Sequence, residues 1–245
     1  TDVDDKIINQ AKKENIAIDE VTAFYIKAFM EDAKRINLLE EKTIHPHATD
    51  YVPKMVDFVK ELVDKGAAYE VDGDVFFDIT RAKDYGKLSK KNIDELRSGA
   101  RISVDEKKKN PLDFALWKAQ KDAFEPAWES PWGMGRPGWH IECSVMAQNL
   151  LGETIDIHAG GADLEFPHHE NEIAQSEAAT GETYVNTWMH VGFVQVNSEK
   201  MSKSLNNFFT IREVLRHYHP EVLRFFIAAS HYRSPLNYSD AALDQ

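Results

Sequence analysis

The second half of the chain alternates between two hydrophobic periods, and this alternation limits the fold more than any other feature of the sequence. Helical spacing predicts a helix from about His140 to Leu151, and the segment ETIDIH, residues 153–158, predicts a strand after it. A second helix is expected after Pro167, and WMHVGFVQVN, residues 188–197, alternates like another strand. Helices that alternate with short strands in this way are typical of a parallel α/β core.

The first half of the chain predicts two helices and then a hairpin. Apolar residues recur at helical spacing over about 19–39 and again in DYVPKMVDFVKELVDKG, residues 50–66. The segment AAYEVDGDVFFDI, residues 67–79, changes to a strand period. Its Asp72-Gly73 pair is typical of a tight hairpin turn.

A polar and basic segment, residues 85–110, separates this hairpin from the α/β half. It is punctuated by glycines, so we expect an irregular module on the surface. The segment PLDFALWK, residues 111–118, then predicts a buried strand. The hairpin and the basic segment therefore resemble an insertion into the α/β core.

Composition and charge exclude several classes of protein. The chain has 245 residues, 42% of them hydrophobic, and a net charge of −12, which is typical of an ordinary globular protein. Its single cysteine, Cys143, excludes an internal disulfide framework, and no apolar run approaches the roughly 20 residues that a bilayer requires. We expect a cytoplasmic protein without membrane contact, which would hold nucleic acid only through local basic patches.

The segment EFPHHENEIAQSEAA, residues 165–179, begins a predicted helix with an unusual number of possible metal ligands. His168 and Glu172 are four residues apart, so they point the same way on a helix. Cys143 is expected in the first turn of the preceding helix, where the helix dipole lowers the pKa of a thiol. Thiolate, imidazole and carboxylate are all zinc ligands, so these three residues form a candidate site. It either leaves one position open for a substrate or takes another ligand from elsewhere.

Two simpler explanations stay open for these residues. Cys143 lies on an apolar helical stripe that runs to Leu150, so it is also suited to be a small buried side chain. A histidine and a glutamate on one helix face are often only solvated. The neighbouring Glu165, His169 and Glu170 are predicted to be surface groups or groups that support the ligands.

The segment KMSKS, residues 200–204, is a candidate phosphate-binding loop between a strand and a helix. Lys200 and Lys203 are mobile point charges that can reach phosphate oxygens, and the serine hydroxyls can add hydrogen bonds. The same composition is also common in solvated loops, so the pattern alone leaves both explanations open.

A glycine pair, Gly160-Gly161, follows the predicted strand TIDIH. Glycine allows the backbone to approach a ligand closely at the carboxyl end of a strand, although most such pairs only form turns. His158 and Asp163 flank the pair, and their side chains are suited to bond a ribose or an amino group, or to cap the loop.

Several segments together resemble one known family. GRPGWHIECS, IHAGGADLEFPHHENEIAQSEA and KMSKS occur in this order, and TDVDDKII, SGARI and PLDFALWK add to the match. The chain resembles the cysteinyl-tRNA synthetase family of class I aminoacyl-tRNA synthetases along its whole length. The second segment is long and distinctive, whereas KMSKS alone would indicate only a class I synthetase.

The resemblance implies an α/β fold, a Rossmann-type catalytic core with a connective-peptide insertion and C-terminal helices. It implies four parts: the remainder of the first Rossmann half with linking helices (1–66), the insertion (67–111), the second Rossmann half with the zinc site and the KMSKS loop (112–209), and the start of a helical stem-contact region (210–245). The family's HIGH-type signature and first zinc cysteine are not in the sequence. We therefore expect a fragment that lacks the N-terminal half-Rossmann segment and the C-terminal anticodon region.

The resemblance also implies roles for single residues. It implies a Zn2+ ion held by Cys143, His168 and Glu172, with one further family cysteine. It implies that Lys203, helped by Lys200, stabilises the phosphates of ATP, which is used with Mg2+. The resemblance also implies that Trp139, His140 and Thr1 lie beside the cysteine substrate. His158 and Asp163 are further substrate-binding candidates. Gly160 and Gly161 are ATP-binding candidates.

The expected reaction joins cysteine to tRNA(Cys) through a cysteinyl-adenylate. Serine differs from cysteine by one atom, and packing alone separates such substrates by only about 1–3 kcal/mol. A zinc ion that accepts the thiolate of the substrate discriminates chemically, because a hydroxyl is a harder and less acidic ligand. We expect a monomer. Two alternatives stay open: a cysteine ligase with an amino-sugar acceptor, and an inactive zinc-binding fragment.

Overall fold

The computed structural model describes all residues of the chain except 39, 93–106, 203–204, 206 and 245, together with the side chain of residue 40. Its contacts divide the chain into two compact units, which we describe separately. Unit 1 comprises residues 1–8, 46–158 and 163–188, and unit 2 comprises 9–45, 159–162 and 189–245. Among the described residues, no helix has the length and apolar character needed to cross a membrane.

Unit 1 contains a four-stranded antiparallel meander. Its strands are β1 (Ala68–Val71), β2 (Asp74–Phe77), β3 (Phe114–Ala119) and β4 (Gly135–Pro137), in that order across the sheet. The turn between β1 and β2 is Asp72-Gly73, and both residues have a positive φ, which explains the aspartate and the glycine at these positions. The hairpin predicted from the sequence is confirmed.

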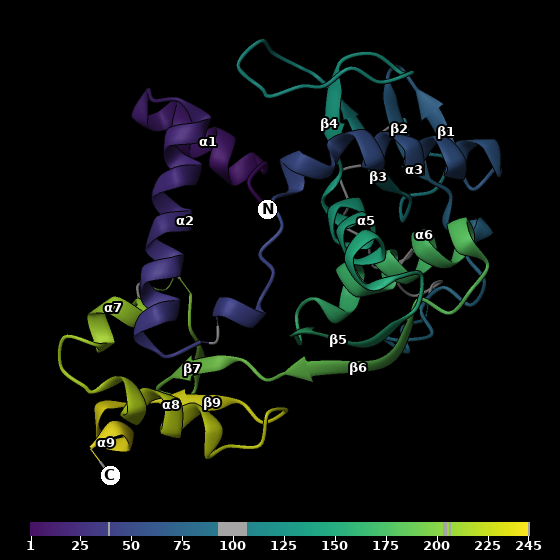
Figure 1. Ribbon diagram of the computed structural model, residues 1–245. Coiled ribbons are helices and arrows are strands. Elements are labelled where there is room, and N and C mark those ends of the chain that lie inside the picture. Colours follow the sequence, from purple (N-terminus) through teal and green to yellow (C-terminus); the bar gives the residue numbers. More distant parts are fainter. Residues whose placement is uncertain (39, 93–106, 203–204, 206, 245) are drawn as a thin grey trace. The chain divides into compact units, whose positions relative to one another are not determined.

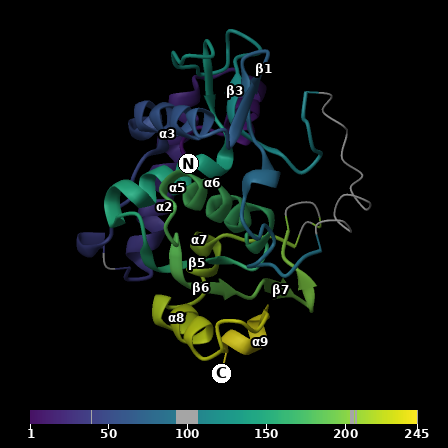
Figure 2. The same ribbon diagram turned by 90° about the vertical axis from the view of Figure 1, so that its right-hand side faces the viewer.

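Three helices pack around this sheet and form the main core of unit 1. They are α3 (Val52–Asp64), α5 (Trp139–Leu151) and α6 (Glu170–Thr180), and the short helices η2 (Ala48–Tyr51) and η3 (Ile79–Arg81) lie beside them. Figure 1 shows α3 across one face of the sheet, and Figure 2 shows α5 and α6 side by side below it. The side chains of Met55, Leu62, Phe77, Leu116 and Trp117 are completely buried between these elements. The buried strand predicted in PLDFALWK is confirmed by β3.

A second sheet consists of β5 (Ile155–Gly161) and β6 (Val185–Val191). The backbone N–H of Ile155 donates to the carbonyl of Tyr184, and that of Ala162 donates to the carbonyl of Val191. Residue numbers therefore rise together along both strands, which run parallel, as the sequence predicted. The irregular turn η4 (Glu165–His169) connects β5 to α6.

Unit 2 combines short strands with helices. Strand β7 (Val194–Val196) pairs antiparallel with β8 (Glu199–Lys200) and parallel with β9 (Leu236–Tyr238). A small core forms from Val214, Leu215, Leu223 and Leu243. The helices of this unit, in chain order, are most of α1 (Asp5–Glu14), α2 (Ile18–Arg35), η1 (Glu40–Lys42), α7 (Ile211–Val214), α8 (Pro220–Ala228) and α9 (Asp240–Leu243).

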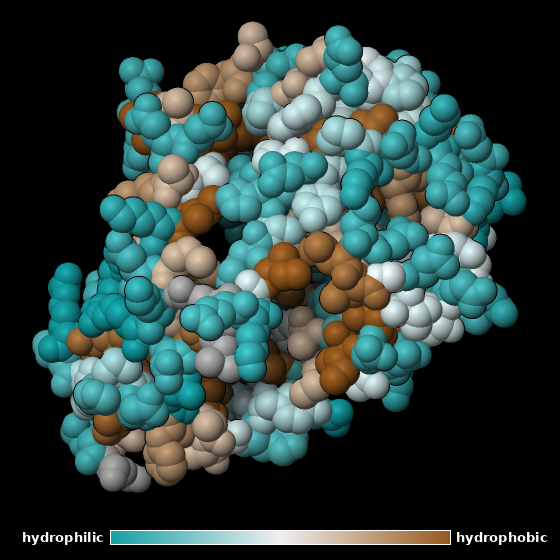
Figure 3. All heavy atoms as spheres, in the orientation of Figure 1, coloured by the Kyte–Doolittle hydropathy of each residue, from teal (hydrophilic) through white to brown (hydrophobic). Residues whose placement is uncertain are grey.

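The four parts predicted from the sequence are parts of a family architecture rather than compact units, so their boundaries stay a prediction. Hydrophilic residues cover much of the face drawn in Figure 3. Residues 93–106, which make up most of the basic segment 85–110, lie outside the described residues.

Candidate functional site

A close contact between β3 and α5 places the first turn of α5. Gly138 precedes the helix, and a Cβ atom on this residue would overlap the carbonyl of Ala115. The helix begins at Trp139, one residue before the predicted start, and Cys143 follows one turn later. On the other side, η4 and α6 bring His168 and Glu172 to the same face by their four-residue spacing.

Cys143, His168 and Glu172 converge in unit 1. Their potential ligand atoms all lie within 4.8 Å of one another. The two residues on α6 and η4 are buried, whereas Cys143 is partly buried. The three side chains come from two segments that are 25 residues apart along the chain, so this convergence is produced by the fold. The explanation that they only belong to separate solvated or apolar faces does not hold for this arrangement.

The two carboxylate oxygens of Glu172 have different surroundings. Oε2 lies 2.9 Å from Nε2 of His158 and accepts a 3.0 Å hydrogen bond from the hydroxyl of Tyr184. Oε1 lies 2.9 Å from Nε2 of His168, but the direction of that contact leaves it without a hydrogen-bond donor among the described residues. A completely buried carboxylate with one anchored oxygen and one unsatisfied oxygen fits a metal ligand.

The protonation of the cluster follows from burial and from these contacts. Burial raises the pKa of Glu172, but the close contacts and charges of His158 and His168 outweigh it and hold this pKa at about 2. Burial, with the nearby Glu172 and Glu142, raises the pKa of the Cys143 thiol to about 12. The lowered thiol pKa predicted from the helix dipole is therefore wrong, since desolvation outweighs the dipole when no cation is present.

Aromatic rings surround the metal-ligand candidates. The ring of Trp139 stacks on His168 at 4.3 Å between centroids, and Nδ1 of His140 lies 2.9 Å from Nδ1 of His168. Burial and the neighbouring His168 lower the pKa of His140 to about 3. A neutral His140 can share one proton with His168, so this contact fixes the orientation of both rings. Trp139 remains 45% exposed, which leaves part of its ring available to a ligand.

A second set of possible ligands shares Glu172 with the first. It consists of His158, His169 and Glu172, whose ligand atoms also lie within 4.8 Å of one another. His158 stacks on Trp188 at 4.7 Å between ring centroids. His169 and Glu170 are each only 1% exposed, so of the two predicted roles, surface group or supporting group, only the second fits them.

The remaining predicted site residues do not belong to this cluster. The hydroxyl of Thr1 donates to the carbonyl of Val3, and Thr1 also bonds the buried Glu142, whose pKa burial raises to about 7. Asp163 is exposed after β5, and Gly160 and Gly161 form the end of that strand.

The KMSKS segment, residues 200–204, which we call the lysine loop, belongs to unit 2. Lys200 ends β8, and its ammonium lies 4.0 Å from the centre of the Phe193 ring. Lys203 lies outside the described residues, so its predicted role is not tested by the structure.

Several basic side chains that are suited to form local basic patches have partners within the protein. Arg212 pairs with Asp32 at 3.2 Å, and Arg224 donates to the carbonyl of Ile36 at 2.7 Å. Lys87 pairs with Glu177 at 2.5 Å. These contacts favour structural roles for the three residues.

Sequence reasoning missed the polar groups that join α5 to α6. The amide of Gln175 donates to the carbonyl of His140 and to the hydroxyl of Ser144, each at 2.7 Å. Ser176 donates to the same hydroxyl at 2.9 Å. Tyr184, the donor to Glu172, was missed as well. Nothing in the local pattern marks these residues, because their partners lie on other elements.

The fold defines the class of protein. Methionyl-tRNA synthetase from Mycobacterium tuberculosis, solved with bound methionyl-adenylate, superposes with a TM-score of 0.69 over 100% of this chain and 58% of that chain, at 14% identity. A second structure of that enzyme with methionyl-adenylate gives 0.69 over 98% and 57%, at 15% identity. These likenesses define a Rossmann-type class I synthetase fold, as the sequence predicted.

The sequence comparisons define the family. The model of the tRNA synthetases class I (C) catalytic domain matches residues 1–245, so the chain belongs to this family. The cysteine–tRNA ligase of Finegoldia magna is 60% identical over 243 residues, which are 99% of this chain and 53% of the relative. That of Pseudomonas syringae pv. syringae is 59% identical over 244 residues, with the same shares. The chain thus spans about half the length of these curated relatives.

Proposed function

We propose that this chain is part of a cysteine–tRNA ligase that activates cysteine with ATP and passes it to tRNA(Cys). The observation that supports the proposal most is the convergence of Cys143, His168 and Glu172 within 4.8 Å in a chain about 60% identical to two cysteine–tRNA ligases. Both relatives are named for tRNA charging. No feature of the described residues favours the amino-sugar acceptor or the inactive fragment.

The three converging side chains fit a Zn2+ ion. A thiolate, an imidazole and a carboxylate are a common zinc donor set, and three protein ligands leave the fourth tetrahedral position open. When bound, the ion supplies a soft Lewis acid that prefers the sulfur of cysteine to the oxygen of serine. The chain itself holds Glu172 through His158 and Tyr184, so the donor atoms need little rearrangement.

The rings beside this cluster are suited to hold the amino acid. Trp139 presents a partly exposed face next to His168, and His140 is fixed by its contact with the same ring. A small apolar surface and a neutral imidazole suit a short side chain better than a long or charged one. The assignments of Thr1, His158 and Asp163 to the substrate remain part of this proposal.

ATP binding is assigned to the glycine pair and to the lysine loop. Gly160 and Gly161 lack side chains at the end of β5, where backbone can approach a nucleotide. Lys200 and Lys203 supply positive charge where the phosphates of ATP gain negative charge during adenylate formation. ATP with Mg2+, tRNA(Cys), a cytoplasmic location and a monomeric state belong to the same proposal.

Metal analysis tests the central claim. Zinc content and cysteine affinity are measured for the wild type, Cys143→Ser, His168→Ala and the control His47→Ala, a histidine exposed outside the cluster. Both cluster variants should lose zinc and weaken cysteine binding, whereas the control should match the wild type. Unchanged zinc in both cluster variants contradicts the assignment.

Cysteine-dependent pyrophosphate exchange tests the reaction class. The exchange should require cysteine and ATP, and serine should support it far less. Aminoacylation assays with tRNA and with an amino-sugar then identify the acceptor. Exchange that proceeds equally with serine contradicts a sulfur-selective site.

A further inference from the structure

Glu170 lies between His168 and Glu172 in the sequence, at the start of α6, but its side chain points in another direction. It is two residues from His168 and two from Glu172, and side chains two positions apart on a helix lie on nearly opposite faces. Its side chain is 1% exposed, yet it belongs to neither group of possible metal ligands. A buried carboxylate needs partners of its own, because an unpaired one is costly.

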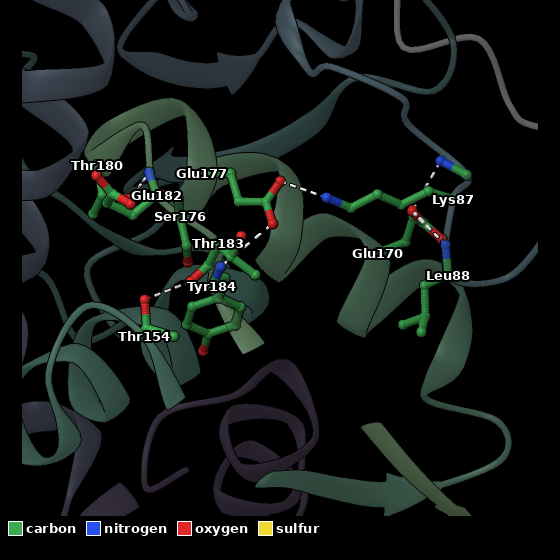
Figure 4. A network of polar contacts seen from close by, with 11 residues as sticks. Lys87, Leu88, Thr154, Glu170, Ser176, Glu177, Thr180, Glu182, Thr183 and Tyr184 are labelled. Carbon is green, nitrogen blue, oxygen red and sulfur yellow. Dashed lines mark hydrogen bonds and ion pairs between the residues drawn. The ribbon is translucent and has the colours of Figure 1, made fainter. Parts of the chain in front are cut away.

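Those partners are backbone groups of the segment 86–89. Oε1 of Glu170 accepts hydrogen bonds from the N–H groups of Gly86 at 2.8 Å and Leu88 at 3.4 Å, and Oε2 accepts one from Ser89 at 2.9 Å. Figure 4 shows this carboxylate reaching from the helix toward the neighbouring segment. Hydrogen bonds to an ionised acceptor are stronger and more directional than those between neutral groups.

Two more contacts attach the same segment to α6. The hydroxyl of Tyr85 bonds the side-chain oxygen of Asn171, and the ammonium of Lys87 pairs with Glu177. Figure 4 shows the Lys87 contact on the same helix, farther from its start. The contacts differ in kind: the Glu170 side chain is buried, whereas the Lys87 side chain is 41% exposed.

We propose that Glu170 is a positioning residue: by binding the backbone of 86–89, it fixes the first turn of α6 and thereby the donor atoms of His168 and Glu172. This inference rests on the proposed function, since it assumes that these two residues hold a metal. Segment 86–89 lies within the predicted insertion, residues 67–111. The inserted module therefore sets the affinity and geometry of the metal site without supplying a ligand.

The charge and the acceptor capacity of Glu170 are both needed for this role. Glutamine has the same shape but replaces one oxygen with an N–H2 group, which would face the backbone N–H groups that now donate to the carboxylate. In the Glu170→Gln variant the segment and the turn should therefore separate, and the two ligands should lose their fixed directions.

Cobalt substitution of the full 245-residue chain tests the proposal. Co2+ is titrated into wild type, Glu170→Gln and the matched control Lys87→Met, and the thiolate charge-transfer and d–d bands are recorded. Loss of an outer partner of a metal ligand typically weakens metal binding by roughly 10- to 100-fold. We expect this loss in Glu170→Gln, with altered d–d bands at saturation, and a dissociation constant within twofold of wild type in Lys87→Met.

The outcomes separate the proposal from the function on which it rests. A wild type with cobalt–thiolate bands and a Glu170→Gln variant with the same affinity and spectrum overturns the positioning role alone. A Glu170→Gln variant that is less stable but has the wild-type spectrum at saturation also overturns it, because the role would then be purely structural. A wild type without any thiolate band overturns the metal site itself and the positioning role with it.

A second variant keeps the test valid if Glu170→Gln does not fold. Tyr85→Phe removes only the hydroxyl that bonds Asn171, and its ring remains in place. Cobalt affinity should fall by about threefold, in line with the loss of one hydrogen bond to a neutral group. An unchanged affinity in a folded Tyr85→Phe variant then overturns the conclusion that the attachment of the inserted module to α6 sets the metal site.

Discussion

The cluster around Glu172 and the loop that begins at Lys200 are both charged, but the protein holds them differently. Glu172 is completely buried. Its carboxylate is surrounded by three side chains: His158 of β5, His168 of η4 and Tyr184, which precedes β6. Lys200 is exposed, and its ammonium lies over the ring of Phe193. Under the proposed function this difference suits the two roles: a donor atom that selects a ligand is fixed in advance, and a charge that reaches a phosphate keeps its side chain in water.

The largest effect on stability is expected at Glu172. Replacement by alanine leaves His158 and Tyr184 without their partner and opens a cavity, so the metal-free protein should lose about 3–5 kcal/mol. Urea unfolding of the metal-free protein measures this loss. The control Glu61→Ala removes an exposed ion pair with Lys65 and should cost about 0–1 kcal/mol. Equal losses in both variants would remove the contrast between buried and exposed charge.

Acidification should remove the contribution of Glu172 in a defined pH range. The pKa of Glu172 in the folded protein is about 2, which lies below the ordinary value of 4.5. Between these two pH values the unfolded state binds more protons than the folded state. The contribution of Glu172 to stability is therefore present above pH 4.5 and is lost as the pH falls toward 2. The contribution is on the order of 3 kcal/mol. The difference in stability between wild type and Glu172→Ala, measured at steps from pH 6 to pH 3, should therefore shrink. A constant difference would show that the carboxylate is not held in its ionised form.

A smaller effect is expected when only one donor to the carboxylate is removed. Tyr184→Phe deletes the 3.0 Å hydrogen bond to Oε2 of Glu172 and keeps the buried ring, so it should cost about 1–3 kcal/mol. The urea midpoint gives the stability change, and cobalt titration shows whether the ligand direction changes with it. If Tyr184→Phe left the stability unchanged, His158 alone would anchor the carboxylate.

The smallest effect on stability is expected in the lysine loop. Lys200→Ala removes an exposed cation–ring contact, worth about 0.5–1 kcal/mol. If the proposed function is correct, the same variant should slow cysteine-dependent pyrophosphate exchange by on the order of 10²-fold, because positioned charge stabilises the transition state. A large loss of stability with normal exchange would reverse the comparison between the two regions.

The sequence predicted the local elements well because their causes are local. The Asp72-Gly73 turn, the strand in residues 111–118 and the start of α5 all follow from backbone preference and hydrophobic period. Cys143 and His168 do lie close together, and their role as metal ligands, which the family resemblance implied, stays a prediction.

What failed depended on the environment that the complete fold creates. The thiol pKa was predicted from the helix dipole alone, whereas burial of Cys143 among carboxylates has the larger effect. Glu170 has the sequence context of a solvated helix start, and only the distant residues 86–89 make it a buried acceptor. Tyr184 is one of eight tyrosines, and its sequence neighbours do not distinguish it.

Gly138 extends these conclusions to a residue without any functional group. The carbonyl of Ala115 occupies the space that its Cβ would need, and its φ of −71° is open to every amino acid, so the restriction is one of space alone. Any side chain there would push the start of α5 away from β3 and carry Cys143 with it. In a saturation mutagenesis screen scored for metal retention, position 138 should tolerate as few replacements as the three proposed ligand positions.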